Sequence, residues 1–464
     1  MKKITISILF CVIAISAFAQ NVKVEGFVQE KTAPDSYIVP SDPAVRQKLD
    51  QWQDLKFGVL FHWGIYVVPG IVESWSIMSG DVDWQYKPRK KMGMDYDTYK
   101  KWYFALEDKF NPVKFDPQQW ADVMQDAGMK YMLFTSKHHD GFAMYDSKYS
   151  DFGIAHGAFK DNPKKDVLRY VLQAFRDKGF MVGPYFSKPD WHNKYYWNPM
   201  FATGQSMGPN YDKTKHPDWW KQFKAYACNQ VAEITQDYGP VDILWLDGGM
   251  RIEDLGIDSV ILESRKKYPG LICVDRGQTG PWENYRTPEQ NIPETKLDYP
   301  WESCITLSTY HWSYHDPETF RTPREVVNTL SEIVAKGGCL ALGVGPDPEG
   351  LIDVRVTSIL HQVGLWMHAN GQAIYNTRPT EIYNDGRTWF TADKNGKTLY
   401  AIYALPDGEK LPTTISWKGN VPTGKMKLLA GNKTVKYTVN GDEVTVKLPK
   451  DMQADSFALT FNKK

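Results

Sequence analysis

The chain has 464 residues, of which 42% are hydrophobic and 24% are charged. This composition excludes a disordered chain, and the length predicts two domains. Because 55 Lys and Arg residues balance 55 Asp and Glu residues, we expect no nucleic-acid partner and no attraction to an anionic membrane surface. The aromatic share of 14% fits either carbohydrate stacking or a large aromatic core.

Residues 1–19 have the pattern of a secretory signal peptide. Lys2 and Lys3 precede an apolar run, which ends in the small-x-small triplet AFA at residues 17–19. The run is shorter than the ~20 residues that span a bilayer, which disfavours the alternative of a membrane anchor. We therefore expect cleavage near Ala19, export to the periplasm or the extracellular space, no membrane insertion of the mature chain, and a polar leader over residues 20–45.

Residues 46–372 alternate short apolar runs with amphipathic stretches, as repeated βα units around a parallel sheet do. The expected strands are residues 56–62, 131–135, 180–186, 241–246, 271–274 and 338–344. The expected helices are residues 117–127, 167–178, 219–238 and 323–336. The alternation predicts a TIM-like (β/α)8 barrel, whose strand carboxyl ends form the active face.

Residues 373–464 change to β-branched and aromatic alternation with turn signals. Residues 398–403 and 413–417 read as strands, and residues 436–447 read as a hairpin that turns at Asn440 and Gly441. We expect a C-terminal antiparallel β-sandwich domain, which either packs on the barrel or binds sugar itself.

The cysteines left after cleavage are spaced too widely for a CxxC metal site and are too few for a disulfide scaffold. They are Cys228, Cys273, Cys304 and Cys339. We interpret them as buried free thiols, with one disulfide as the open alternative.

Polar residues gather where the expected strands end, which indicates a pocket for a polyhydroxylated ligand. They are His62, Trp63, His138, His139, Asp140, Tyr185, Asp190, Asp247, Asp275 and Arg276.

Two carboxylates stand out. Asp247 follows an apolar strand and precedes two glycines, which leaves it open to a ligand, although a helix N-cap is the alternative. Glu289 lies in a proline-bearing loop after Trp282 and Tyr285, and on its own it would read as a surface glutamate. Glycoside hydrolysis needs one carboxylate to attack or guide water at the anomeric carbon and another to protonate the leaving oxygen.

Five strings along the expected barrel match a known family of enzymes. They are FGVLFHWGIY at 57–66, YMLFTSKHHDGF at 131–142, DF at 151–152, LWLDGG at 244–249 and WESC at 301–304. In them the chain resembles glycoside hydrolase family 29, the retaining α-L-fucosidases. The resemblance implies an exo-acting enzyme that removes terminal α-L-fucosyl residues from fucosylated oligosaccharides or glycoconjugates, and we expect it to need no cofactor and no metal.

The resemblance also implies roles for individual residues. Asp247 is the implied nucleophile and Glu289 the implied acid/base, with Glu302 as a second candidate for the latter. The implied sugar-binding residues are His62, Glu73, Trp75, His138, His139, Tyr185, Trp245, Arg276 and Trp312.

The chemistry of fucose suits these residue types. An aromatic wall from Trp63 and Trp245 fits its C5 methyl, and the paired histidines fit its axial C4 hydroxyl. Neighbours in a strand point to opposite faces, so His138 and His139 can both face the pocket only if the strand has already ended.

Three alternatives remain on sequence grounds. A metal hydrolase is disfavoured because the histidines are scattered and the string from His311 to His315 lacks the Glu of a zinc helix. A non-catalytic fucose-binding protein would have lost one carboxylate, and this chain keeps both. A glycosidase for a related sugar stays open, since specificity depends on pocket shape.

Overall fold

The computed structural model describes residues 37–80, 83–203 and 206–463. The predicted signal peptide, residues 1–19, and the leader up to residue 36 lie outside this part of the chain. Within it, none of the helices combines the length and the apolarity that crossing a membrane requires.

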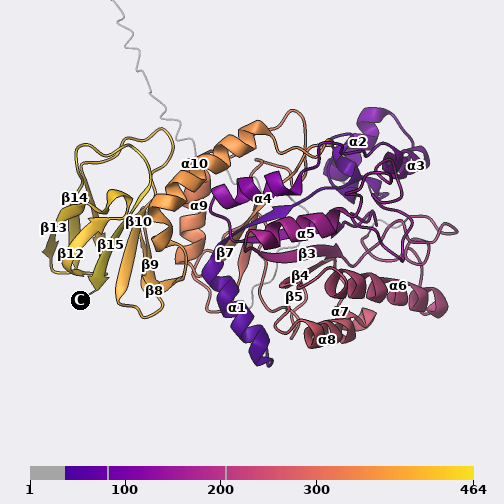
Figure 1. Cartoon of the computed structure of the whole chain (residues 1–464), viewed down its shortest axis with the longest axis horizontal. Coiled ribbons are helices and arrows are strands. Elements are labelled where there is room, and N and C mark those ends of the chain that lie inside the picture. The colour runs from indigo at the N-terminus through magenta and orange to yellow at the C-terminus, as the bar shows by residue number, and fades with distance from the viewer. Residues whose placement is uncertain (1–36, 81–82, 204–205, 464) are drawn as a thin grey trace, which may run out of the picture.

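A curled parallel sheet forms the centre of the larger part of the molecule (Figure 1), with strand order β5-β4-β3-β2-β1-β7-β6. Its strands are β1 (Phe57–Phe61), β2 (Tyr131–Lys137), β3 (Met181–Ser187), β4 (Ile243–Asp247), β5 (Ile272–Asp275), β6 (Glu302–Thr306) and β7 (Cys339–Val344). Chain order follows spatial order and β7 returns to β1, so the predicted TIM-like barrel is confirmed. Each predicted strand is present within two residues; β6 was not predicted.

An irregular segment, residues 282–290, occupies the eighth barrel position. The amide of Asn284 donates to β5 (2.9 Å), and the carbonyls of Arg286 and Pro288 accept from β6 amides (2.7 and 3.0 Å). A regular ladder cannot continue here because Pro288 has no N–H to donate. Glu289 therefore lies beside β6 inside the barrel wall and not on a distant surface loop.

Helices surround the parallel sheet, with α2 and α3 grouped at one end of it (Figure 1). They are α1 (Pro43–Leu55), α2 (Asp83–Met92), α3 (Tyr96–Phe104), α4 (Pro117–Asp126), α5 (Val167–Asp177), α6 (Pro217–Gln236), α7 (Ile252–Leu255), α8 (Ile257–Lys267), α9 (Pro323–Ala335) and α10 (Val354–Asn370). Helices α4, α5, α6 and α9 are the predicted ones. Local signals set where they start. Helix α9, for example, begins with a capping box between Thr322 and Glu325 and has Pro323 at its first position.

The C-terminal part is one antiparallel sheet, with strand order β11-β14-β13-β12-β15-β10-β9-β8. The strands are β8 (Thr377–Asp385), β9 (Thr388–Asp393), β10 (Thr398–Tyr403), β11 (Thr414–Lys418), β12 (Pro422–Leu428), β13 (Thr434–Asn440), β14 (Glu443–Lys447) and β15 (Phe457–Lys463). The predicted hairpin is present, with Gly441 at φ 64° in its turn. Lys418 at the end of β11 donates from its backbone to Asp385 of β8 (2.6 Å), so the sheet nearly closes around its own core. The predicted C-terminal β domain is confirmed.

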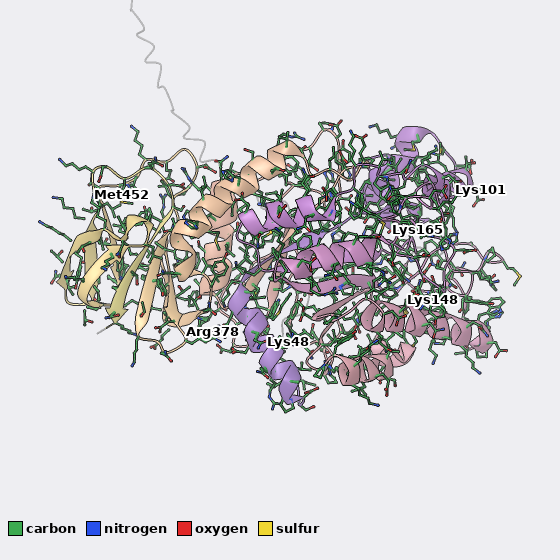
Figure 2. The ribbon with its side chains drawn as sticks, viewed as in Figure 1. Lys48, Lys101, Lys148, Lys165, Arg378 and Met452 are labelled. Carbon is green, nitrogen blue, oxygen red and sulfur yellow. The ribbon has the colours of Figure 1, made fainter. Side chains whose placement is uncertain are left out.

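The C-terminal sheet packs against α9 and α10 (Figure 1). The indole of Trp366 on α10 donates to the Ser456 carbonyl (2.8 Å). At the same junction Arg378, labelled in Figure 2, pairs with Asp54 of α1 (2.7 Å). Of the two expected alternatives, packing on the barrel is therefore observed.

The four cysteines within the described residues, Cys228, Cys273, Cys304 and Cys339, are free thiols. Three of them are buried in β5, β6 and β7, as predicted, whereas Cys228 on α6 is only half-buried. The alternative of a disulfide among them is excluded in this structure.

Candidate active site

Histidine and tyrosine rings meet at the carboxyl ends of the first three strands. His62 follows β1, and its ring centroid lies 5.4 Å from that of Tyr185 on β3. Strand β2 ends at Lys137, so His138 and His139 follow it directly with ring centroids 4.3 Å apart. The expected end of the strand is confirmed, and it lets both imidazoles face the same site.

Asp247 is the last residue of β4, and four groups surround its carboxylate. Tyr185 donates to Oδ2 (2.6 Å), while the Gly248 amide and Arg276 Nη1 donate to Oδ1 (2.8 and 3.1 Å). His139 Nε2 lies 3.8 Å from Oδ2. Burial alone would raise the pKa of Asp247, but Arg276, His139 and the Tyr185 hydroxyl hold it well below its usual range. The carboxylate is therefore ionised in the free protein.

Arg276 joins the two candidate catalytic carboxylates. Its Nη1 bonds to Asp247 and its Nη2 to Glu289, whose other oxygen accepts from the Trp312 indole (3.0 Å). Burial raises the pKa of Glu289; Arg276 opposes that rise and the Asp247 charge adds to it, with a net increase. Asp247 therefore favours the ionised form, and Glu289 favours the protonated form.

The wall beside Glu289 depends on close packing around Trp312. A side chain at Gly343 of β7 would meet the Trp312 ring at 2.7 Å, so only glycine leaves room for the indole. The next residue, Ser313, donates its amide to Glu73 Oε1 (2.8 Å). Glu73 and Trp312 therefore belong to one connected side of the site.

Hydrogen bonds fix the tautomer of His139. The Ser187 hydroxyl donates to the Pro189 carbonyl (2.9 Å), so its 2.5 Å contact with His139 Nδ1 needs the proton on Nδ1. Burial lowers the pKa of His139 to about 4, which keeps the ring neutral at pH 7. Its Nε2 lone pair then faces the Asp247 carboxylate. Two acceptors side by side are suited to a ligand hydroxyl.

The imidazoles of His62 and His138 are also neutral, like that of His139. Burial lowers the pKa of His62 to about 4, and burial together with the neighbouring imidazoles lowers the pKa of His138 well below its usual value. His138 Nδ1 contacts the Ser74 hydroxyl, whereas His62 Nδ1 is buried without a hydrogen-bond partner in the described chain. A polyhydroxylated ligand would satisfy that nitrogen.

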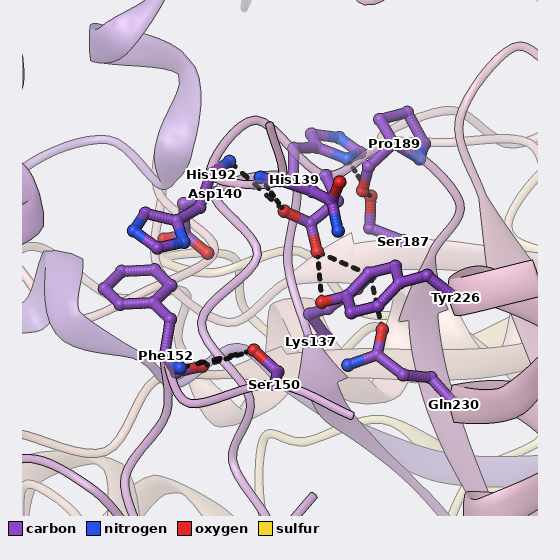
Figure 3. Close-up of polar contacts among 12 residues, drawn as sticks. Lys137, His139, Asp140, Ser150, Phe152, Ser187, Pro189, His192, Tyr226 and Gln230 are labelled. Carbon is purple, nitrogen blue, oxygen red and sulfur yellow. Dashed lines mark hydrogen bonds and ion pairs between the residues drawn. The ribbon is translucent and has the colours of Figure 1, made fainter. Parts of the chain in front are cut away.

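A buried ionic network consists of Asp190, Lys137, Tyr226 and Gln230; Figure 3 labels its last three members together with His139. Asp190 pairs with Lys137 (3.1 Å) and accepts from Tyr226 (2.9 Å), while Lys137 also donates to Gln230 (3.0 Å). A side chain at Gly141, whose φ is +87°, would meet Asp190 at 2.2 Å. The network thus supports the turn that carries the histidine pair, and Asp190 is held away from a ligand.

Glu302 lies deeper, within the barrel interior. Its Oε1 accepts from the Trp245 indole (3.2 Å), and the side chain is fully buried. Burial raises the pKa of Glu302 to about 7, although the neighbouring Tyr131 hydroxyl and Trp245 partly offset this. Trp245 in turn stacks on Tyr185 at 5.1 Å, so Glu302 supports the ring layer beneath Asp247.

Two indoles differ in their placement. Trp75 packs edge-on against His139, with centroids 5.0 Å apart, at the side of the site. The expectation that Trp63 forms part of a sugar-facing wall is wrong: Trp63 is fully buried and packs on Phe110 and Trp120. The chain turns after His62, which directs the next side chain outward, between the sheet and α4.

Sequence reasoning missed the two serines that hold the histidines. Ser187 ends β3 and Ser74 begins a short 3-10 helix after Glu73. For Ser187 the strand-end position was a usable signal. For Ser74 no local pattern indicated a contact with His138, because 64 residues separate the two in the chain.

Two carboxyls on one arginine, at the carboxyl ends of barrel strands, are an arrangement that suits glycoside hydrolysis. The chain belongs to the α-L-fucosidase family, glycoside hydrolase family 29, since the family model described as Alpha-L-fucosidase matches residues 26–372. It is an α-L-fucosidase.

Curated relatives and solved structures agree with this assignment. Human plasma alpha-L-fucosidase is 28% identical over 425 residues, which cover 85% of this chain and 82% of the relative. Alpha-L-fucosidase isoenzyme 1 from Paenibacillus thiaminolyticus superposes with a TM-score of 0.74 at 27% identity, covering 91% of this chain and 100% of the other. Thermotoga maritima alpha-fucosidase in complex with fucose superposes with a TM-score of 0.70 at 25% identity, covering 94% of this chain and 100% of the other.

Proposed function

We propose that this α-L-fucosidase releases terminal α-L-fucosyl residues from glycans with retention of configuration, using Asp247 as nucleophile and Glu289 as acid/base. The observation that carries the proposal is the Arg276 bridge between the two carboxyls, of which one has a lowered and the other a raised pKa. Retention needs two carboxyl groups about 5–5.5 Å apart across the glycosidic bond.

In the first step, an Asp247 carboxylate oxygen bonds to the anomeric carbon of fucose. The bond from that carbon to the leaving oxygen breaks, and Glu289 gives its proton to the leaving oxygen. The products are a fucosyl ester of Asp247 and the shortened glycan.

The second step uses the electrostatic coupling between the carboxyls. The Asp247 charge contributes to the raised pKa of Glu289, and esterification removes that charge. Glu289, which lost its proton in the first step, therefore stays a carboxylate more readily and accepts a proton from water while the water oxygen attacks the anomeric carbon. The ester bond breaks, Asp247 is again a carboxylate, and fucose leaves.

We propose that the neutral histidines and the neighbouring tryptophans recognise fucose. Nε2 of His139 lies 3.8 Å from Asp247 Oδ2, the buried Nδ1 of His62 has no hydrogen-bond partner in the described chain, and Trp245 and Trp312 supply flat apolar surface beside these rings. The complex of the Thermotoga maritima enzyme with fucose supports the same sugar here. Export after cleavage near Ala19 rests on the signal-peptide pattern of residues 1–19.

The stereochemical test follows the anomer formed first. Proton NMR of the purified protein with an aryl α-L-fucoside should detect α-L-fucose before mutarotation sets in. Initial β-L-fucose would overturn the proposal, because a single displacement by water inverts the anomeric carbon.

A leaving-group test separates the two acid/base candidates. Glu289→Ala should lose more activity on a natural glycan than on an activated aryl fucoside, whose leaving group needs no proton, and azide should restore part of it. Glu302→Gln is the control and should not show this dependence on the leaving group. If Glu302→Gln showed it and Glu289→Ala did not, the role would belong to Glu302.

A further inference from the structure

A cluster of two histidines and a glutamate lies on the loop between β6 and α9. One ligating atom from each of His311, His315 and Glu318 lies within 4.8 Å of the others. His311 Nδ1 contacts Glu318 Oε2 at 2.8 Å, and the two imidazoles stack with centroids 3.6 Å apart. The proposed reaction uses none of these three side chains.

We propose that this cluster binds one divalent transition-metal ion of the zinc class. Two imidazole nitrogens and one carboxylate oxygen are a donor set that Zn²⁺ takes in four-coordinate sites, with water as the fourth ligand, whereas Mg²⁺ and Ca²⁺ prefer oxygen alone. The ion replaces the proton between His311 and Glu318. The stacked rings tilt apart so that both lone pairs point at it.

The surroundings of the cluster suit a cation that arrives from solvent. The His311 side chain is 34% exposed, whereas the Glu318 side chain is 5% exposed. The cluster lines a hollow beside the end of β7, together with Asp353 at the start of α10, whose carboxylate is paired with Arg355. An entry path and a buried anionic ligand are therefore both present.

The position of the cluster gives the ion a structural role. His311 and His315 flank Trp312 and Ser313, which hold Glu289 and Glu73 respectively. An ion bound to both histidines would fix this stretch of loop from its outer side. It would thereby order the wall that contacts the acid/base, while taking no part in bond breaking.

Metal binding can be measured without reference to fucosidase activity. Untagged mature protein is dialysed against chelator and then titrated with Zn²⁺ by isothermal calorimetry, with the thermal midpoint followed in parallel. We expect saturable binding of about one ion per chain and a rise in the midpoint of a few degrees. Co²⁺ in the same protein should show the visible absorption of a tetrahedral site.

Matched variants decide whether the ion binds at this cluster. His315→Ala should abolish the saturable binding and the Co²⁺ spectrum, and Glu318→Gln, which keeps the shape of the side chain, should weaken the affinity at least tenfold. His361→Ala is the control, because His361 forms an exposed pair with Asp126 (2.7 Å) on another helix. Absence of saturable binding, or binding that survives in a folded His315→Ala protein, would overturn the proposal.

Discussion

At the scale of single residues, we expect Ser187 to influence the proposed reaction through the tautomer of His139. The variant Ser187→Ala leaves His139 Nδ1 and the Pro189 carbonyl without the hydroxyl that now bonds to both. An unsatisfied buried group costs about 1–3 kcal/mol, and the imidazole is then free to take the other tautomer. We expect kcat/KM on an aryl fucoside to fall roughly 10- to 100-fold.

A second buried serine supplies the control. Ser147 donates to Glu233 Oε2 (2.9 Å) on α6, behind the barrel sheet, and contacts no candidate ligand-binding group. Ser147→Ala should lower the thermal midpoint as Ser187→Ala does, but leave kcat/KM near that of the parent. Equal kinetic effects of the two substitutions would show that Ser187 has no special influence on His139.

Glu302 predicts a pH dependence of stability. Burial raises its folded pKa from 4.5 to about 7. Between these values the folded chain holds a proton that the unfolded chain releases, so this stabilising contribution is complete below pH 4.5 and is lost as the pH rises through 7. The loss amounts to about 3 kcal/mol at most.

The variant Glu302→Gln isolates this contribution. Its amide oxygen can still accept from the Trp245 indole, and it does not ionise. Urea unfolding of both proteins at pH 5 and pH 8 gives the difference in free energy of unfolding between variant and parent. This difference should favour the variant more at pH 8 than at pH 5. A stability difference independent of pH would mean that Glu302 does not change protonation in this range.

At the scale of elements, the turn after β4 sets the position of Asp247. Gly248 has a φ of +97°, and a side chain there would meet Pro189 at 2.2 Å, whereas a side chain at Gly249 would meet nothing within 4 Å. Gly248→Ala must shift the backbone that carries Asp247, the proposed nucleophile. A displacement of about 1 Å is enough to cost roughly 100-fold in rate.

The paired glycines give this prediction its own control. Steady-state kinetics of Gly248→Ala should show a fall in kcat of about that size, while Gly249→Ala should stay within about twofold of the parent. Should the two substitutions reduce kcat alike, the close approach to Pro189 would not be what fixes the turn.

Whether a strand could be predicted from the sequence depended on the pattern of apolar and polar residues along it. Strands such as β4 begin with apolar side chains and end at one polar residue, which marks both the strand and its functional end. Strand β6 starts with Glu302 and Ser303, both buried, so its pattern does not read as a core strand. The site followed the same rule: strand-end residues such as His62 and Asp247 were predicted, whereas Ser74, which contacts His138 from 64 residues away, had no signal in the sequence.

Trp63 shows that a position at a strand end does not by itself place a side chain in the site. It stands at a strand end next to His62 and resembles a wall residue in sequence, yet it is fully buried between the sheet and α4. Which way a side chain points after a strand ends depends on backbone turns that hydropathy does not report.

At the scale of the whole molecule, α10 joins the two parts of the structure. The chain length predicted two domains, but the interface between them depends on pairs such as Trp366 and Ser456, 90 residues apart. Sequence periodicity cannot identify such pairs, because each residue alone reads as an ordinary helix or loop position. The coupling of the two parts is therefore a property that only the assembled fold reveals.

That coupling leads to a prediction about cooperative unfolding. Trp366 is 7% exposed and donates to the Ser456 carbonyl, while its neighbour Leu365 is 61% exposed. Trp366→Ala removes a large buried side chain and should lower the free energy of unfolding by about 3–5 kcal/mol, whereas Leu365→Ala should change it by less than about 0.5 kcal/mol. Because α10 packs on both parts, calorimetry of Trp366→Ala should show one transition at a lower temperature. Two separated transitions, with only one of them displaced, would show that the barrel and the C-terminal sheet unfold independently.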